Sequence, residues 1–301
     1  MKSNLTKLAA AGLLTLAATA SAMAGSVTQP GETVGVALGA PLPPGFYFLD
    51  TSSWGVRDVG GIKESVGVTI PFIVWSTPWK VLGARVSLLA ATPALEVGTT
   101  SGIVRTPIGP VAVPSTYNES VYNPFIGGSL AWDLGGGLGV SYILGAYIGV
   151  SDSLADKASF FINRGTLSYT ANGWNLTASA VVGTALDTVN PLTNPNAHPD
   201  YLNVDLTATK TFGKWEVGAV GFYSTDLDSV NQVTGYQKQS QFALGGLVGY
   251  DWGQLKTQVY LTRDVYQQNY GGYDTRVWGR LVVPLGDPFG PPASPGMMYH
   301  K

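Results

Sequence analysis

Alternation of apolar and polar residues is clearest between Gly165 and Val182. Asn172-Gly173 lies near the centre of this stretch, and both residues tolerate the positive φ that a two-residue type I′ turn requires. Pairing Ala171 with Trp174 across that turn gathers apolar side chains on one face and hydroxyl, amide and guanidinium groups on the other. The stretch therefore predicts a β-hairpin with one apolar face. That face could enter the core of a soluble sandwich or contact lipid in a membrane barrel.

The same period of two recurs along the chain from Gly45 onward, where twelve segments are predicted to be strands. Most have about the 9 to 11 residues that a tilted transmembrane strand needs. The segments are 45–54, 65–75, 79–91, 120–132, 138–150, 160–171, 174–186, 201–212, 215–225, 239–250, 254–265 and 274–285.

The connections between these segments alternate in length. Those after even-numbered segments are tight, such as Ser76-Thr77-Pro78 and Gly213-Lys214, whereas those after odd-numbered segments are mostly longer, such as residues 55–64 and 92–119. Short periplasmic turns and long extracellular loops are typical of up-and-down outer-membrane barrels, and a Greek-key sandwich has no reason to produce them. We therefore predict an all-β, transmembrane antiparallel barrel of about 12 strands, with both ends of the mature chain periplasmic.

Tryptophan placement supports the same prediction. Six of the eight Trp residues lie in or beside the short turns, where amphipathic rings would lie at one membrane interface. These residues are Trp75, Trp79, Trp132, Trp174, Trp215 and Trp252. Separate small cores in a soluble protein would not gather the rings at one end of the strands.

The composition agrees with a chain that crosses a membrane as strands. Charged residues make up 12% of the chain and hydrophobic residues 45%, whereas soluble domains average about 25% charged residues. The chain contains no Cys, which excludes a disulfide framework and a Cys-ligated metal site. Beyond the N-terminus no apolar run approaches the roughly 18 residues of a membrane-spanning helix.

Residues 1–24 are predicted to be a secretory signal peptide, with a lone membrane anchor as the alternative. Lys2 and Lys7 form its basic start, residues 8–20 its apolar stretch, and Ala22-Met23-Ala24 its cleavage site. Removing it leaves 15 of the 17 Lys and Arg against 19 Asp and Glu, a net charge of −4. No basic patch then remains for nucleic acid.

Three further segments complete the predicted organisation. Residues 25–44 are rich in Pro and Gly and form a lead-in segment that is either periplasmic or folded into the lumen. Residues 45–285 form the barrel, and residues 286–301 form a Pro-rich tail. The long connection 92–119 has few charges, so we expect it to enter the mouth as a constriction or to stand up as a β-extension.

The predicted inner face is polar and carries both signs of charge. Arg or Lys facing lipid near the midplane would cost about 2 to 4 kcal/mol each, so alternation assigns these groups to the lumen. The candidates are Arg85, Arg164, Asp205, Glu216, Lys256, Tyr260, Asp264, Arg276, Trp278 and Arg280. They either contact a solute or form a network that fills the barrel.

The final predicted hairpin gives the most specific site hypothesis. Pairing Val265 with Thr275 would set Asp264 opposite Arg276 and Tyr260 opposite Arg280. Together with Trp278, these groups would form a lumen wall of rings and guanidinium groups. Such a wall suits an aromatic solute that bears a hydroxyl or a carboxylate.

Three motifs carry a family resemblance: residues 42–48 (LPPGFYF), Tyr122-Asn123-Pro124-Phe125 leading to Trp132, and Asn194-Pro195 running into residues 201–223. Together they resemble the outer-membrane family named for the meta pathway of phenol degradation, over about residues 42–285. The resemblance implies a barrel in the outer membrane of a Gram-negative bacterium that passes small hydrophobic or aromatic compounds. Its implied partners are outer-membrane lipid, such a solute and the barrel-assembly machinery. The family supplies no catalytic residues, and the Pro-rich tail departs from the aromatic ending of many barrels.

A barrel enzyme, such as a lipase or a protease, is the alternative function, and a structural barrel without transport is a third. The enzyme would need a His paired with Ser or Asp. The two His residues are His198 in a Pro-rich loop and His300 in the tail, so neither lies on a predicted strand. We therefore expect a solvated His198, no catalytic site, no metal and no cofactor.

Overall fold

The computed structural model describes residues 26–59, 61–106, 109–155, 157–187, 198–227 and 237–288. The predicted signal peptide, His300 and most of the predicted tail lie outside these residues. Within them, no helix is long and apolar enough to cross a membrane.

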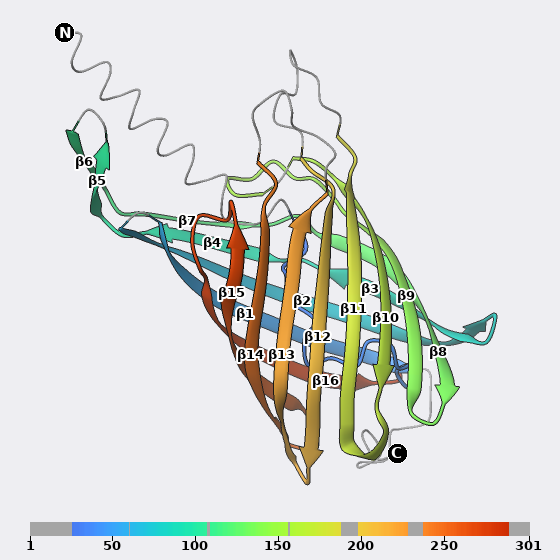
Figure 1. Cartoon of the computed structure of the whole chain (residues 1–301). Helices are drawn as coiled ribbons and strands as arrows, with labels where there is room; N and C mark the ends of the chain where they lie inside the picture. Colours follow the sequence, from blue (N-terminus) through green and yellow to red (C-terminus); the bar gives the residue numbers. More distant parts are fainter. Residues whose placement is uncertain are drawn as a thin grey trace.

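Twelve antiparallel strands form a closed barrel, as predicted (Figure 1). Strands that follow one another around the barrel pair along their length, and β1 pairs with both β2 and β16. Closure gives the backbone groups of every strand a partner, which the bilayer cannot provide. The barrel strands are β1 (Gly45–Val59), β2 (Ile62–Val81), β3 (Ala84–Ala91), β8 (Phe125–Gly135), β9 (Leu138–Tyr147), β10 (Phe160–Tyr169), β11 (Trp174–Ala185), β12 (Tyr201–Phe212), β13 (Trp215–Asp226), β14 (Ser240–Asp251), β15 (Lys256–Gln268) and β16 (Thr275–Gly286).

The hairpin of β10 and β11 has the register predicted from its alternation. Tyr169 pairs with Leu176, and a short 3₁₀ turn, η1 (Ala171–Gly173), connects the strands. Asn172 and Gly173 have φ values of +54° and +75°, in agreement with the predicted turn chemistry. The next short turn also closes as predicted, because Phe212 pairs with Trp215.

Strand β2 differs from the prediction at both of its ends. Ser76-Thr77-Pro78 is not a turn, because β2 continues to Val81 and the chain reverses at Leu82-Gly83. The ladder instead shifts register between Ser76 and Lys80, where a bulge accommodates Pro78, which has no amide to donate. At the other end, residues 55–64 are not a long loop, since β1 and β2 pair as far as Val59 and Ile62.

The long connection 92–119 stands up as a β-extension and does not form a constriction. Strand β4 (Ala94–Thr99) pairs with the outer half of β2, and β7 (Thr116–Val121) pairs with β4. Strands β5 (Gly102–Thr106) and β6 (Gly109–Val113) form a separate hairpin. Figure 1 shows the β5–β6 hairpin at the upper left, away from the barrel, whereas β4 and β7 continue the wall beside β2.

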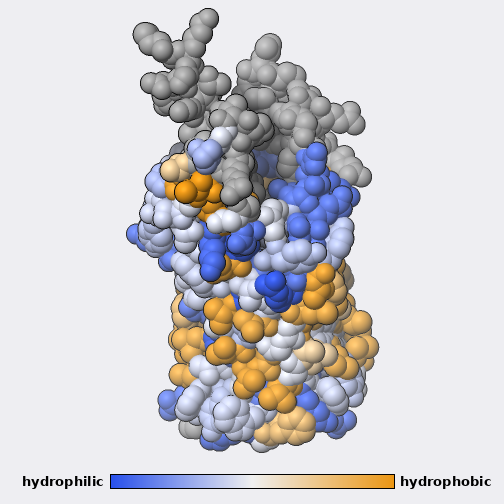
Figure 2. Space-filling view, turned by 60° about the vertical axis from the view of Figure 1, so that its left-hand side comes forward, coloured by the Kyte–Doolittle hydropathy of each residue, from blue (hydrophilic) through white to orange (hydrophobic). Residues whose placement is uncertain are grey.

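The outer face of the barrel carries an apolar band. On the face seen in Figure 2, hydrophobic residues cover much of the lower half of the molecule, with hydrophilic residues above them and at the bottom rim. A band of this kind between two polar zones is the surface that a bilayer requires. Exposed members include Ile73, Leu88, Ile126, Leu167, Leu206, Val217 and Val259.

Gly183 leaves space that the ring of Tyr201 fills on the inner face. A Cβ atom added at Gly183 would lie 2.1 Å from Cζ of Tyr201, whereas a Cβ atom at Gly165, on the outer face, would meet no atom within 4 Å. We predict that Gly183→Val lowers the free energy of unfolding by about 1 to 3 kcal/mol through overpacking. Urea unfolding in detergent micelles, followed by the gel-mobility difference between folded and unfolded barrels, measures this change.

Gly165→Ala is the matched control for this variant and should leave the unfolding midpoint unchanged. An equal loss of stability in both variants would show that the packing of Tyr201 over Gly183 is not the cause.

Candidate functional site

The lumen contains a stretch of the chain itself, residues 26–44, which we call the inner segment. It enters at the long-loop end, where the side-chain amide of Asn203 donates to Oγ of Ser26 at 2.8 Å. It leaves at the short-turn end, where the amide of Gly39 donates to Oγ of Ser168 at 2.9 Å, and then begins β1. Figure 1 shows it in blue within the barrel. Of the two alternatives predicted for this lead-in segment, the described residues therefore follow the one in which it folds into the lumen. The side of the membrane on which the mature chain begins stays a prediction.

The sequence of the inner segment explains its compact path. Pro30 and Gly31 form the centre of a turn in which the amide of Glu32 donates to the carbonyl of Gln29 at 3.1 Å. Gly31 and Gly35 have φ values of +86° and +83°, which suits the third position of a type II turn. Successive turns replace strand pairing, so the segment is held mainly by side chains of the wall.

Asp205 on β12 is the main anchor. Its carboxylate accepts from the amide of Gly31 at 2.9 Å, from the amide of Thr33 at 3.0 Å and from the hydroxyl of Thr33. Thr207, two residues along the same face, accepts from the amide of Gly35 at 2.7 Å. Hydrogen bonds to an ionised acceptor are roughly twice as strong as neutral ones, so Asp205 fixes the middle of the segment.

Arg164 on β10 forms an ion pair with Glu32 of the inner segment, with 2.6 Å between Nη2 and Oε1. Both side chains are largely buried. A charge buried without a partner is costly, so each of these two groups requires the other.

Arg280 on β16 holds the inner segment from the opposite wall. Its guanidinium donates to the backbone carbonyls of Glu32 and Val34. It also donates to wall groups: Oγ1 of Thr51 at 2.9 Å, Oε1 of Gln258 at 3.1 Å and Oη of Tyr260 at 3.0 Å. The ring of Tyr260 is stacked on Trp278 at 5.1 Å.

The predicted register of the last hairpin is wrong by two residues. Tyr260 pairs with Trp278, and Gln258 pairs with Arg280. The shift keeps the predicted faces, because side chains alternate with a period of two. Asp264 does not lie opposite Arg276; instead, its carboxylate accepts from the amide of Asp274 at 2.8 Å and so closes the loop.

A second charged cluster lies at the long-loop end, between β1, β2 and the loop before β16. Arg57 and Glu64 form a buried ion pair at 2.8 Å, and Arg276 pairs with Asp274 at 3.0 Å. The guanidinium of Arg57 lies over the ring of Tyr270, and burial raises the pKa of this Tyr to about 12. Sequence reasoning missed Arg57 and Glu64 because both were assigned to a loop.

The remaining candidates lie toward the short turns. Glu216 binds Lys256 at 2.6 Å and Gln258 at 2.8 Å, and Gln258 also donates to the carbonyl of Gly35 at 3.1 Å. Arg85 donates to the carbonyl of Thr77 at 3.1 Å. The predicted site residues thus do not all meet at one point, and their role in contacting a solute stays a prediction.

Five of the six predicted interface Trp residues lie in or beside strand ends near the short turns, whereas Trp75 lies within β2, opposite Phe46 at the start of β1. Trp79, Trp215 and Trp252 are more than half exposed, while Trp75 stacks on Phe46 at 5.5 Å. Lys210 lies over the ring of Trp174 at 4.7 Å, with its stem along the outer face. Anchoring at a membrane interface remains the prediction for these rings.

One side of the lumen is apolar, which the sequence analysis missed. Buried side chains from β2, β3, β4, β8, β9 and β10 form a continuous hydrophobic cluster, and the ring of Tyr201 joins it. Its members include Val66, Val68, Ile70, Leu89, Leu95, Val97, Phe125, Ile143, Phe160 and Ile162. The predicted polar interior is therefore found mainly on the other side, although Ser87 and Ser141 are buried on strands of the apolar side.

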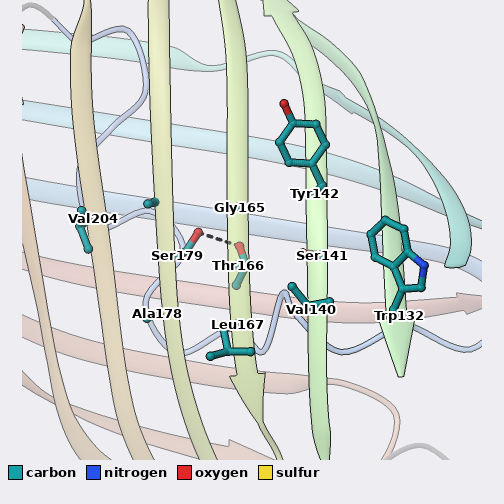
Figure 3. A pocket seen from close by; sticks show the side chains of 11 residues that line it. Trp132, Val140, Ser141, Tyr142, Gly165, Thr166, Leu167, Ala178, Ser179 and Val204 are labelled. Atoms are coloured by element: carbon teal, nitrogen blue, oxygen red, sulfur yellow. Dashed lines mark hydrogen bonds between the residues drawn. The ribbon is translucent and has the colours of Figure 1, made fainter. Parts of the chain in front are cut away.

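Two hollows of about 420 Å³ each lie on the outer face of the wall. In the hollow of Figure 3, Trp132, Tyr142, Leu167 and Val204 stand around a floor that includes Gly165. The pairing of β10 with β9 and with β11 is continuous past Gly165. This hollow is therefore a lipid-facing depression and does not open into the lumen.

His198 is not the solvated loop residue that we expected. It pairs with Asp187 at 3.1 Å between Nδ1 and Oδ2, and its ring packs edge-on against Phe160 at 5.8 Å. These contacts attach the end of its loop to β10. In the described ranges no cluster of three or more His, Cys, Asp or Glu is placed to hold a metal ion.

The family model described as "Putative MetA-pathway of phenol degradation" matches residues 45–281. No curated protein matches the sequence. Among solved structures, an outer membrane channel from Pseudomonas putida F1 matches with a TM-score of 0.57 and 13% identity, over 85% of this chain and 99% of that chain. The β domain of the Bordetella autotransporter BrkA matches with a TM-score of 0.48 and 10% identity, over 79% and 99%.

The anchor at Asp205 leads to a direct prediction. Asp205→Ala removes three hydrogen bonds to the inner segment, and bonds to charged groups contribute about 1.5 to 3 kcal/mol each. We expect amide hydrogen exchange in residues 31–35 to become at least about tenfold faster, since 1.4 kcal/mol is a factor of ten. Mass spectrometry of a peptide that covers this stretch measures the rate.

Asp152→Ala is the control, because Asp152 is exposed and its carboxylate accepts from the neighbouring amide of Ser153. Unchanged exchange in Asp205→Ala would show that the inner segment is held by other contacts.

Proposed function

The chain belongs to the MetA phenol-degradation family and forms a channel-like barrel of the outer membrane, and from this premise we propose that it admits small hydrophobic or aromatic compounds when the inner segment moves aside. The observation that carries the proposal is the two-sided lumen. A hydrophobic cluster faces a wall of hydroxyls, amides and paired charges, and the inner segment lies between them.

The two sides suit a solute that is itself two-sided. The apolar side offers branched aliphatic side chains and rings such as Ile70, Leu95 and Phe125. A hydrocarbon or aromatic surface gives up no favourable hydration when it packs against them. The polar side offers hydroxyl groups in series, including Thr177, Ser179 and Thr207, which can replace water around one polar substituent. A sugar would have to desolvate hydroxyl groups against the apolar side, which is unfavourable.

Release of the inner segment would leave the barrel intact. The segment is bound by individual hydrogen bonds and by the Arg164–Glu32 ion pair, whereas the barrel is held by continuous ladders between neighbouring strands. Each neutral hydrogen bond contributes about 0.5 to 1.5 kcal/mol net. A limited number of such contacts can be exchanged for water or solute while β1 stays paired with β2 and β16.

The printed title of the similar structure from Pseudomonas putida F1 calls it an outer membrane channel, which supports transport for this chain. A barrel enzyme is the alternative, and the ionisable groups of its lumen argue against it. These groups are each bound by the inner segment or by neighbouring wall groups: Asp205, Glu216, Arg164 and Arg280. Such contacts are expected of groups that hold the inner segment in the lumen.

Deleting residues 26–38 tests the proposal. The deletion removes the Asp205, Arg164 and Arg280 contacts, so we expect conductance in planar bilayers and liposome swelling with 4-hydroxybenzoate to rise severalfold. Swelling with glucose should rise less, because the apolar side of the lumen disfavours a sugar.

The control is deletion of the β5–β6 hairpin, residues 102–113, which removes a similar length of chain outside the barrel and should leave both rates unchanged. A folded barrel that lacks residues 26–38 and conducts no better than the full chain would refute the proposed path.

A further inference from the structure

Val34 of the inner segment is enclosed by aromatic side chains of the wall. Its exposed fraction is 0%, and it clusters with Phe222, Leu247, Tyr260 and Trp278. Phe222 and Tyr260 flank Trp278, the first edge-on at 6.3 Å and the second stacked at 5.1 Å. Trp278 is oriented by a 3.0 Å hydrogen bond from its indole nitrogen to Thr262. A small aliphatic side chain therefore lies in a cluster that contains three rings, and we call this cluster the box.

Arg280 lies at the polar end of this box. Its Nη1 donates to the carbonyl of Val34 and its Nη2 to the carbonyl of Glu32, and its exposed fraction is 3%. The two terminal nitrogens of the guanidinium thus bind one carbonyl each, and the same two donors can bind the two oxygens of one carboxylate. Here both acceptors are neutral, and the nearby carboxylate of Glu32 binds Arg164 instead.

The inner segment fits the box too closely to share it with a guest. A Cβ atom at Gly31 would lie 2.6 Å from Cδ1 of Phe222, and one at Gly35 would lie 2.7 Å from Cδ1 of Leu247. The backbone of the segment therefore lies in close contact with the wall at Gly31 and at Gly35, on both sides of Val34. A guest that enters the box must displace residues 31–35.

We propose that Val34 and the carbonyls of Glu32 and Val34 stand in for a small aromatic carboxylate, which binds in this box and displaces the inner segment. The ring of the solute takes the place of the Val34 side chain among Phe222, Tyr260 and Trp278. Its carboxylate takes the place of the two carbonyls on Arg280. This inference rests on the proposed function, since it names the solute class and the step that opens the lumen.

The physical reason for the exchange is the charge of the solute. A carboxylate on a buried guanidinium forms hydrogen bonds roughly twice as strong as those of a neutral carbonyl and neutralises a charge that now has only neutral acceptors. Aromatic rings packed edge-on or offset gain stabilisation beyond that of their burial alone. Both gains offset the loss of the segment's contacts with Arg280 and with the box.

Benzoate binding to the purified full chain in detergent, measured by isothermal titration calorimetry, tests the proposal. We expect saturable binding of benzoate and none of the neutral isostere benzamide. Arg280→Gln should weaken binding at least about tenfold. Arg280→Lys should also weaken it, because Lys keeps the positive charge but lacks the two parallel N–H donors of a guanidinium. Val34→Ala should strengthen binding, since it weakens the competitor within the box.

Lys63→Gln provides the control, because Lys63 is an exposed cation near the tip of the β1–β2 hairpin, away from the box, and its loss should leave benzoate affinity unchanged. Benzoate should also accelerate amide exchange in residues 31–36 of the full chain. Absence of benzoate binding, or binding that leaves this exchange unchanged, overturns the inference.

The two proposals fail separately. If the full chain binds benzoate but the variant that lacks residues 26–38 conducts no better than the full chain, the proposed channel is refuted and the binding site stands. Flux through the deletion without benzoate binding would refute the site and keep the channel.

Discussion

Charged groups buried inside a membrane barrel must find partners within the protein, and the inner segment provides them. Asp205, Arg164 and Arg280 lie on three different strands, and each is 6% exposed or less. None of these groups can reach bulk water, and an unpartnered buried charge costs several kcal/mol. The backbone amides, carbonyls and Glu32 of a single stretch satisfy all three. The position of residues 26–44 therefore follows from the charges that the strands place inside.

The same contacts make the closure reversible in principle. A partly satisfied polar network is worse than a fully satisfied one, so the inner segment can leave only when water or a solute takes over its hydrogen bonds. The apolar side of the lumen offers few such groups, among them the hydroxyls of Ser87 and Ser141, so most of the exchange would take place on the wall from β10 to β16. Under the proposed function, the chemistry of that wall, with one guanidinium beside three rings, would select which solutes compete with the inner segment.

Much of the fold could be predicted because barrel strands obey local rules. The alternation between Gly165 and Val182 determined both faces and the register of one hairpin, and the Asn172-Gly173 turn has the predicted positive φ at both residues. Strand β2 was harder to predict, because residues 71–75 (PFIVW) are continuously apolar and hide the period of two. Pro78 resembles a turn residue there but lies in a bulge. The last register was missed by two residues because alternation fixes the face and leaves the offset open.

The site could be predicted only in part, since its partners are far apart in the sequence. Gly31 and Asp205 are separated by 174 positions, and no local pattern indicates that a Pro- and Gly-rich lead-in binds a strand carboxylate. The most direct measurement is thiol labelling of Val34→Cys, which would be the sole thiol of a chain without Cys. A closed lumen predicts that a small maleimide labels it far more slowly than Ile103→Cys, a 69% exposed position on β5, until urea unfolds the barrel. Equally fast labelling of both positions in the folded protein would contradict an inner segment that fills the lumen.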